Sequence, residues 1–135
     1  MKYAAITTIF VSSLAVAAAF TTGKPAFARL SVATNMSSAA DFVNSEIAAH
    51  DVVVFSKSSC PFCKKTKALL EDLKVEATVH ELNQMDNGSD IQDALMALSG
   101  QRTVPNVFIK GEHIGGNDAC QTAAKEGTLQ TKLGL

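Results

Sequence analysis

The sequence predicts a single α/β domain with a central four-stranded mixed sheet and helices on both faces of that sheet. Two observations carry the prediction. Helical and strand-like patterns follow one another in the order αβαβαββα, which implies two long crossovers and one local hairpin. The run Val52-Val53-Val54-Phe55 is apolar without interruption, as expected of a strand that helices cover on both sides. With 135 residues, 47% of them hydrophobic, the chain can bury one such core.

The first half of the domain is expected to contain two helices and two strands. Ser38, followed three residues later by Asp41, indicates a helix start, and apolar residues then recur at helical spacing. The buried strand follows over residues 51–56. Pro61 suits the first turn of the next helix because its φ is already close to helical. Alternating apolar and polar residues over 75–82 predict the second strand.

The second half of the domain is expected to add a helix, a hairpin and further helical material. Asn87-Gly88 breaks the preceding strand, Ser89 caps the helix, and Gly100 ends it. Two short apolar segments surround Lys110-Gly111, a pattern that is typical of a hairpin. Gly115-Gly116 then leads into the last helical segment.

The N-terminal part of the chain differs in composition from the rest. It contains basic residues but no acid before Asp41. A charged start, an apolar stretch and small residues up to about residue 19 are typical of a cleaved signal peptide, and the stretch rich in Ser, Thr and Ala that follows has the composition of a transit peptide. We therefore expect a targeting presequence over residues 1–37 and the folded domain over residues 38–135.

The two-part presequence also suggests a compartment. It resembles the presequences of algae with secondary plastids, in which an Ala-Phe junction, here Ala19-Phe20, marks the signal cleavage point. The resemblance implies that the mature protein works in a plastid, and the alternative is a plain secretory signal followed by a linker. The apolar stretch is too short and too polar for a membrane span, so no membrane association is expected after the presequence is removed.

The overall charge excludes one class of partner. The formal net charge is −1 and the sequence pI is about 6.3. A protein that binds nucleic acid through its electrostatic field carries an excess of basic residues. We therefore do not expect nucleic acid to be a partner.

The cysteines indicate a redox pair. Cys60 and Cys63 form a C-x-x-C motif, and Cys120 lies far downstream, which is not the even set of a disulfide framework. A C-x-x-C motif also supplies half of a zinc site, but a structural zinc needs four ligands. No second pair exists, and His80 and His113 stand alone in the sequence, so we expect no metal and assign the histidines no role.

The position of Cys60 favours a reactive thiolate. Because Cys60 directly precedes Pro61, its sulfur is expected to face the unpaired N–H groups and the positive end of the helix dipole, which lower a thiol pKa. Lys57 places an ammonium where it can add to this stabilisation. Cys63, one helical turn later, can reach back to resolve a mixed disulfide. A disulfide between Cys60 and Cys63 would close only a very small ring, which stabilises a fold little. The pair is therefore expected to alternate between dithiol and disulfide during turnover.

Four blocks of the sequence resemble the dithiol glutaredoxins, a family with the thioredoxin fold. The blocks are Lys57, Cys60-Pro61-Phe62-Cys63, the segment QRTVPNVFI over residues 101–109, and Gly115-Gly116-Asn117-Asp118. The resemblance covers about residues 38 to 135. It implies a monomeric glutathione-dependent thiol–disulfide oxidoreductase that reduces glutathionylated and disulfide-containing proteins. Glutathione is its co-substrate, and no other cofactor is implied.

The resemblance also implies a glutathione site and a cis peptide before one proline. The residues that match those around the glycine carboxylate of glutathione are Lys57, Gln92 and Arg102, with Thr103 beside them. The residues that match those at the γ-glutamyl end are Gly116, Asn117 and Asp118, where a helix start offers N–H groups and Asp118 offers charge. The remaining residues of the expected site are Phe62, as an apolar wall, Val104, as a backbone partner, and Pro105, after the cis bond.

Two other functions remain open at this stage. In one, two copies bridge a [2Fe–2S] cluster through Cys60 and glutathione. Pro61 argues against it, since the family members that resemble cluster carriers usually have glycine or serine there. In the other, the chain is a thioredoxin-like reductase, although thioredoxins typically have Trp before the motif and this chain has no Trp. The family often has cysteine at the position of Asn117, and no catalytic role carries over to Cys120, which is out of register.

Overall fold

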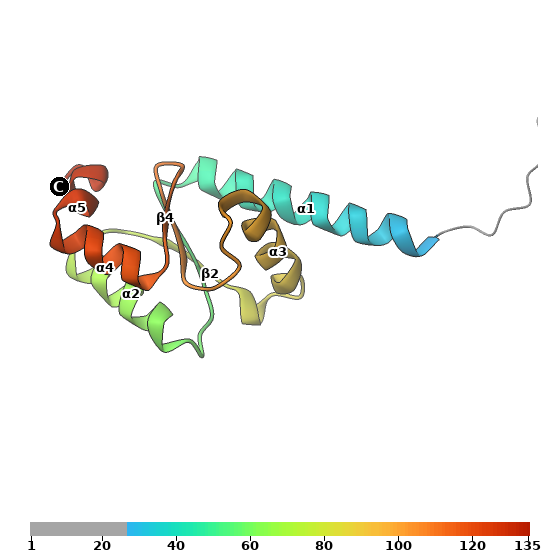
Figure 1. Cartoon of the computed structure of the whole chain (residues 1–135), viewed down its shortest axis with the longest axis horizontal. Coiled ribbons are helices and arrows are strands. Elements are labelled where there is room, and N and C mark those ends of the chain that lie inside the picture. The colour runs from blue at the N-terminus through green and yellow to red at the C-terminus, as the bar shows by residue number, and fades with distance from the viewer. Residues whose placement is uncertain (1–26) are drawn as a thin grey trace, which may run out of the picture.

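The protein folds around a sheet with helices on both faces (Figure 1). The structure is a computed structural model that describes the backbone of residues 27–135 and the side chains of residues 36–135. The expected signal peptide and the first part of the transit-like segment, residues 20–26, lie outside the described residues. The described elements are α1 (Phe27–Ala49), β1 (Val52–Ser56), α2 (Pro61–Asp72), β2 (Thr78–Glu81), the short 3₁₀ helix η1 (Leu82–Gln84), α3 (Gly88–Ser99), β3 (Asn106–Ile109), β4 (Glu112–Gly115), α4 (Asn117–Lys125) and α5 (Thr128–Leu133).

The sheet of the described chain has four strands in the order β2-β1-β3-β4. β1 pairs parallel with β2 and antiparallel with β3, and β3 pairs antiparallel with β4. The mixed four-stranded sheet is therefore as predicted. All five residues of β1 are buried, because a strand in the interior of the sheet has ladders on both edges and helices on both faces. Its carboxyl end leads directly into the loop that carries Cys60.

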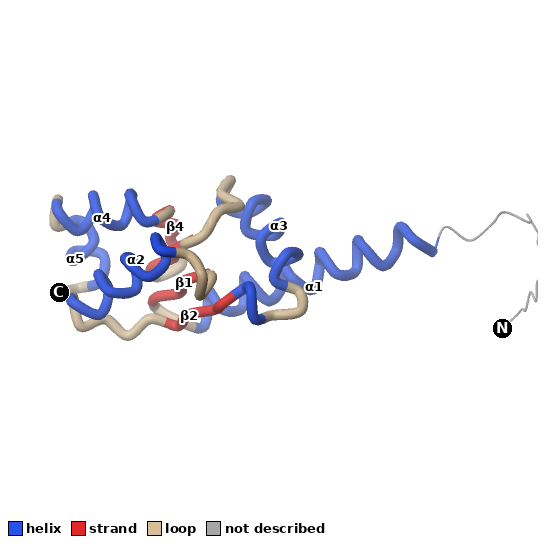
Figure 2. The backbone as a smooth tube through the Cα atoms, turned by 90° about the horizontal axis from the view of Figure 1, so that it is seen from below, coloured by secondary structure: helices blue, strands red, loops and turns tan. Residues whose placement is uncertain are grey.

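The core lies in two layers, one on each face of the sheet. Alternate side chains of β1 point to opposite faces, so Val53 and Phe55 pack with α1 and α3, whereas Val52 and Val54 pack with α2, α4 and α5. Figure 2 shows the two groups of helices on opposite sides of the strands. Each fully buried Val, Leu, Ile or Phe contributes roughly 1.5–3 kcal/mol. The uninterrupted apolar run in the sequence thus reflects burial on two sides, as predicted.

The start of α1 differs from the prediction. The helix begins at Phe27, so Ser38 is an interior residue and does not cap it. The reason is that residues 27–37 contain no Pro or Gly that would interrupt a helix. The part of α1 that packs on the domain begins near Ala39, which is 1% exposed, and the N-terminal part extends beyond α3 (Figure 1). The domain boundary at residue 38 stays a prediction, and α1 runs through it.

Two further boundaries were wrong in detail. β2 begins at Thr78 because its partner in β1 is Val53, so that residues before 77 would extend past the start of β1. The helix α3 begins at Gly88 with Asn87 as its N-cap, and not at a Ser89 cap. Glycine is required there because a Cβ at position 88 would lie 1.9 Å from the Leu82 carbonyl oxygen. No helix in the described part of the chain is both long and apolar enough to cross a membrane.

Candidate active site

Cys60 stands at the start of α2, as the sequence predicts. It is the N-cap residue, with φ −85° and ψ 119°, and Pro61 is the first helical residue. The Cys60 N–H donates to the Lys57 carbonyl at 2.9 Å, and the Cys60 carbonyl accepts from the Lys64 N–H at 3.3 Å. The turn and the first helical bond therefore hold the Cys60 backbone on both sides.

Asn83 of η1 holds the loop before Cys60 in place. The Ser58 N–H donates to Asn83 Oδ1 at 2.9 Å, and Asn83 Nδ2 donates to Ser58 Oγ at 2.7 Å. Two reciprocal hydrogen bonds restrict both the backbone and the side chain of Ser58. Sequence reasoning missed Asn83 because no local signal links residues that lie so far apart along the chain.

The surroundings of Cys60 favour its thiolate. Burial by itself would raise the pKa of the Cys60 thiol, but hydrogen bonds from the Cys63 side chain and from the backbone of Cys63 and Phe62 outweigh it, and the pKa is lowered. The negative charge of Glu81 acts weakly in the opposite direction. The first turn of α2 is thus the source of the stabilisation, as predicted. Lys57, which was expected to add to it, is not among the groups that lower this pKa.

Cys63 has the opposite environment. It is 0% exposed, and burial raises the pKa of its thiol, while contacts with the Lys57 backbone and the Ser56 hydroxyl lower it to a lesser extent. Both cysteines are free thiols in this structure. The motif therefore contains an accessible cysteine whose thiol pKa is lowered and a buried cysteine whose thiol pKa is raised.

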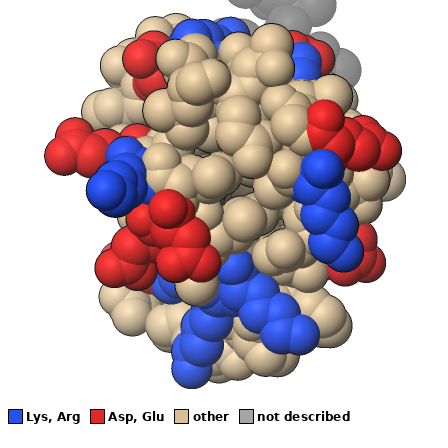
Figure 3. Space-filling model, turned by 90° about the vertical axis from the view of Figure 1, so that its left-hand side faces the viewer, with Lys and Arg blue, Asp and Glu red and all other residues tan. Residues whose placement is uncertain are grey.

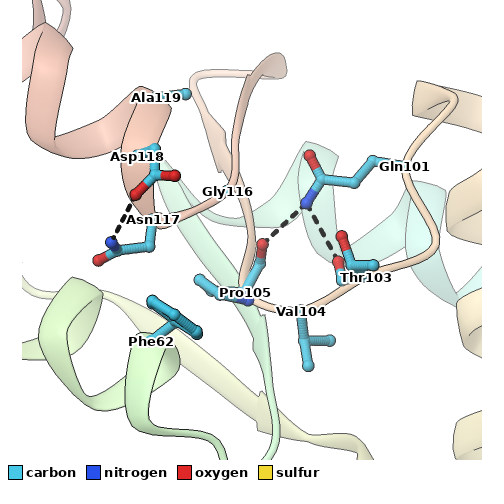
Figure 4. Close-up of a pocket in the computed structure, with 9 residues that line it drawn as sticks. All are labelled: Phe62, Gln101, Thr103, Val104, Pro105, Gly116, Asn117, Asp118 and Ala119. Atoms are coloured by element: carbon cyan, nitrogen blue, oxygen red, sulfur yellow. Dashed lines mark hydrogen bonds between the residues drawn. The ribbon is translucent and has the colours of Figure 1, made fainter.

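A pocket opens along the loop of Val104 and Pro105 (Figure 4). Its volume is about 470 Å³. The Sγ atom of Cys60 lies 3.8 Å from the carbonyl oxygen of Val104, and the peptide bond between Val104 and Pro105 is cis, as expected. The residues that line the pocket are Phe62, Gln101, Thr103, Val104, Pro105, Gly116, Asn117, Asp118 and Ala119. Seven of the residues predicted for the site are among them.

Gln101 supports the loop that carries the cis peptide. Its Nε2 donates to the Thr103 carbonyl at 3.1 Å and to the Pro105 carbonyl at 2.9 Å, as Figure 4 shows. The buried Asn106 in turn donates through Nδ2 to the Gln101 carbonyl at 2.9 Å. Gln101 belongs to the segment over residues 101–109 that resembles the family, but the sequence does not predict it as a site residue, because hydrogen bonds to main-chain carbonyls leave no pattern in the side chains.

The far wall of the pocket is formed where β4 leads into α4. Gly116 is the N-cap of α4, so the free N–H groups of the first helical turn face the pocket region. Gly115 has a φ of +123°, and a Cβ there would lie 3.0 Å from the Cβ of Ala119. Asn117 Nδ2 donates to Asp118 Oδ1 at 3.2 Å. This wall can therefore offer both hydrogen-bond donors and a carboxylate to a ligand.

Comparison with known proteins identifies the family to which this chain belongs. The glutaredoxin family model matches residues 52–114. Glutaredoxin-C8 of Oryza sativa subsp. japonica is 46% identical over 107 residues, which are 78% of this chain and 79% of that protein. Glutaredoxin-C4 of Arabidopsis thaliana is 46% identical over 96 residues, which are 71% of each chain. The chain belongs to the glutaredoxin family.

A solved structure extends the comparison to the fold. A crystal structure of a buckwheat glutaredoxin–glutathione complex is similar, with a TM-score of 0.73 and 38% sequence identity, covering 74% of this chain and 91% of that chain. The Cys60 and Cys63 pair makes this chain a dithiol glutaredoxin with a thioredoxin-like fold. Its activity is that of a glutathione-dependent thiol–disulfide oxidoreductase.

Three residues expected to bind glutathione do not line the pocket of this glutaredoxin. Gln92 Nε2 donates to the Arg102 carbonyl at 3.0 Å. The Arg102 guanidinium pairs with Asp93, with Nε 2.6 Å from Oδ1. Lys57 is half-buried in the loop before Cys60. Their assignment to a glycine carboxylate therefore stays a prediction, and it requires Arg102 to exchange one carboxylate for another.

The lysines of α2 flank the site. Lys64 and Lys65 are exposed, and Lys65 Nζ lies 5.6 Å from the centre of the Phe62 ring. Lys67 pairs with Glu81 at 2.6 Å. Figure 3 shows the end of the molecule that carries α2, α4 and α5, where basic and acidic groups lie around a centre without charged side chains. Charges of both signs therefore surround this end of the glutaredoxin.

His80 and His113 have polar partners, and the third cysteine is buried. His80 Nε2 lies 2.8 Å from Glu46 Oε2, and His113 Nε2 lies 2.8 Å from Asn106 Oδ1, two pairings that the sequence did not show. Cys120 is 0% exposed, and burial raises the pKa of its thiol to about 11. Within residues 36–135 no cluster of three or more His, Cys, Asp or Glu side chains could hold a metal ion.

Proposed function

We propose that this glutaredoxin reduces protein–glutathione mixed disulfides through Cys60 alone and protein disulfides through Cys60 and Cys63 together. The observation that carries the proposal is the opposite environment of the two thiols. Cys60 is partly exposed beside a pocket and has a lowered pKa, whereas Cys63 is buried and has a raised pKa. Attack by a thiolate on a disulfide requires access and ionisation, and Cys60 meets both requirements.

The first reaction is the removal of glutathione from a protein. The Cys60 thiolate attacks the glutathione sulfur of the mixed disulfide, a new disulfide forms between Cys60 and glutathione, and the protein sulfur leaves as a thiolate that takes a proton from water. The thiolate of a second glutathione then attacks the glutathione sulfur on Cys60. The products are glutathione disulfide and the regenerated Cys60 thiolate, so the attacking glutathione is oxidised as one protein cysteine is reduced, while the glutathione taken from the protein stays at the disulfide level.

Protein disulfides follow a second route. Cys60 attacks one sulfur of the disulfide, and the other sulfur leaves as a thiolate. Cys63 then loses its proton and attacks Cys60, which releases the second protein thiolate and closes the disulfide between Cys60 and Cys63. The raised pKa of Cys63 makes this step slower at neutral pH. Two glutathione molecules subsequently reduce the disulfide and leave as glutathione disulfide.

The pocket suggests how glutathione is oriented. The backbone of Val104 lies next to Cys60 Sγ and can pair with the cysteine residue of glutathione. The first turn of α4 faces the other side of the pocket and suits the carboxylate of the γ-glutamyl group, while Asp118 suits its ammonium. At the other end, Arg102 can bind the glycine carboxylate if it leaves Asp93. Because both side chains are about half exposed, their ion pair costs only about 0–1 kcal/mol to break.

The test is a coupled assay with a small mixed disulfide of glutathione and 2-mercaptoethanol. We expect Cys60→Ser to abolish turnover and Cys63→Ser to retain much of it, since the buried thiol takes no part in the first reaction. Equal loss in both variants would refute the assignment of roles. The same assay with thioredoxin reductase in place of glutathione and glutathione reductase tests the thioredoxin-like alternative, and a brown protein after anaerobic purification would favour the cluster-bridging alternative.

We also propose that residues 1–37 direct the domain to a plastid. The support is the composition of the presequence, with a signal-like stretch up to about residue 19 followed by a transit-like stretch without acids. A full-length fluorescent fusion is expected in the plastid of an alga with secondary plastids. A fusion found only in the medium or in the endoplasmic reticulum would instead support the secretory alternative.

A further inference from the structure

A buried hydroxyl connects the helix of the redox pair to the far wall of the pocket. Thr66 follows Cys63 by one turn of α2 and is 0% exposed. Its Oγ1 donates to Oδ1 of Asn117, at the start of α4, over 3.2 Å. A buried hydroxyl that loses its hydrogen-bond partner lowers the stability of the fold. For Thr66 of α2 this partner lies on another helix, α4. The contact therefore couples two elements that meet at the site.

The direction of this hydrogen bond is determined by the next residue. Asn117 Nδ2 donates to Asp118 Oδ1 at 3.2 Å, and an ionised carboxylate can only accept. The amide nitrogen must therefore face Asp118, so the amide oxygen faces α2 and requires a donor. Thr66 supplies that donor. A reversed amide would place oxygen against the Asp118 carboxylate, which is repulsive, so Asp118 determines the orientation of the Asn117 amide and the hydroxyl of Thr66 holds it by donating to the amide oxygen.

The consequence reaches the ligand side of the pocket. Asp118 is exposed and has rotational freedom unless a neighbour restrains it. Asn117 restrains it through Oδ1, which leaves Oδ2 available for a cation in the pocket. We propose that Thr66 is a positioning and specificity residue, which acts through Asn117 to hold Asp118 for the α-ammonium group of the γ-glutamyl end. This inference rests on the proposed function, because it assumes that glutathione occupies the pocket in that orientation.

The test separates positioning from packing with two variants of one residue. Thr66→Val keeps the shape and removes the hydroxyl, whereas Thr66→Ser keeps the hydroxyl. Two substrates are compared, the mixed disulfide of 2-mercaptoethanol with glutathione and the same compound with N-acetylated glutathione, which lacks the ammonium. We expect Thr66→Val to raise KM for the glutathione substrate roughly two- to tenfold, the range of one hydrogen bond, with kcat nearly unchanged. Thr66→Ser should restore most of the affinity.

The N-acetylated substrate supplies the decisive comparison. Since it has no ammonium for Asp118 to bind, its KM should be nearly the same with wild-type protein and Thr66→Val. An equal rise in KM for both substrates, or a Thr66→Ser variant as impaired as Thr66→Val, would show that Thr66 only fills space and would overturn the inference. A wild-type protein without activity on either substrate would overturn the proposed function itself, and with it this inference.

A second test of the connection between Thr66 and Asp118 uses a substitution outside the core. Asn117→Leu breaks the connection at its partly exposed end and is expected to reduce discrimination between the two substrates in the same way. In the Asn117→Leu variant, adding Thr66→Val should not raise KM further, because the two substitutions remove the same interaction. Independent, additive effects of the two substitutions on KM would contradict the proposed connection.

Discussion

Replacing Gln101 with alanine tests whether the loop with the cis peptide depends on a single side chain. Gln101 Nε2 donates to the carbonyl oxygens of Thr103 and Pro105 at 3.1 and 2.9 Å, and Pro105 is buried. A hydrogen bond contributes about 1 kcal/mol net, and a buried group left without a partner costs about 1–3 kcal/mol. Because the Pro105 oxygen has less access to water than the Thr103 oxygen, we expect a total loss of about 2–3 kcal/mol.

The measurement is urea denaturation of the reduced protein, followed by circular dichroism. With an m-value of about 2 kcal/mol/M, the expected loss lowers the midpoint by about 1–1.5 M urea. The melting temperature should fall by about 10 °C, since about 1 kcal/mol corresponds to about 4 °C in a domain of roughly a hundred residues. KM for the glutathione substrate should rise as well, because Thr103, Val104 and Pro105 line the pocket.

Two variants serve as controls for this experiment. Gln84→Ala removes a glutamine that is exposed in η1 and should change stability by less than about 0.5 kcal/mol. Gln101→Glu keeps the length of the side chain but places a carboxylate against two carbonyl oxygens, so it should be at least as damaging as Gln101→Ala. If Gln101→Ala were as stable as Gln84→Ala, the loop would be held by its own conformation and the reasoning would be wrong.

The further predictions concern three single sites, Cys60, Gly88 and Cys120. Iodoacetamide should react with Cys60 of the reduced wild-type protein, in which the Cys63 side chain helps to lower the Cys60 pKa, with an apparent pKa below that of an ordinary thiol. The pKa of Cys60 is lower in the folded protein than in the unfolded chain. Ionised Cys60 should therefore stabilise the fold above the ordinary thiol pKa, and this contribution should be lost as the pH falls through the folded-state pKa. A difference in unfolding free energy between wild type and Cys60→Ser that does not change with pH would contradict this. Gly88→Ala should destabilise the protein by about 3 kcal/mol in urea denaturation, because its Cβ would clash with the Leu82 carbonyl 1.9 Å away, and a neutral effect would mean that α3 can shift. Cys120, whose pKa is raised to about 11, should stay unlabelled by thiol reagents in mass spectrometry until the protein unfolds, and rapid labelling in native conditions would show that the second core layer opens.

The local parts of this fold could be predicted because each depends on residues that are neighbours in the chain. The apolar run of β1, the helix start at Pro61 and the hairpin around Gly111 all carry their own signals of burial, φ or turn geometry. The start of α1 at Phe27 shows the limit of such signals. Ser38 has the pattern of a helix cap. Residues 27–37, however, contain no Pro or Gly that would interrupt the helix before Ser38, so the helix begins earlier.

The sequence by itself therefore determined the fold class, the order of the elements and the position of Cys60 at a helix start. Only the tertiary structure decided which groups support that cysteine and its pocket. Asn83 holds Ser58, Gln101 holds Pro105, and Thr66 holds Asn117. Asn83 and Thr66 have partners 25 and 51 residues away in the sequence, and such hydrogen bonds have no counterpart in local periodicity because folding alone brings donor and acceptor together. Gln101 and Pro105 are close in the sequence, but the acceptor is a main-chain carbonyl, which every residue carries, so the side chains give no pattern that predicts the bond.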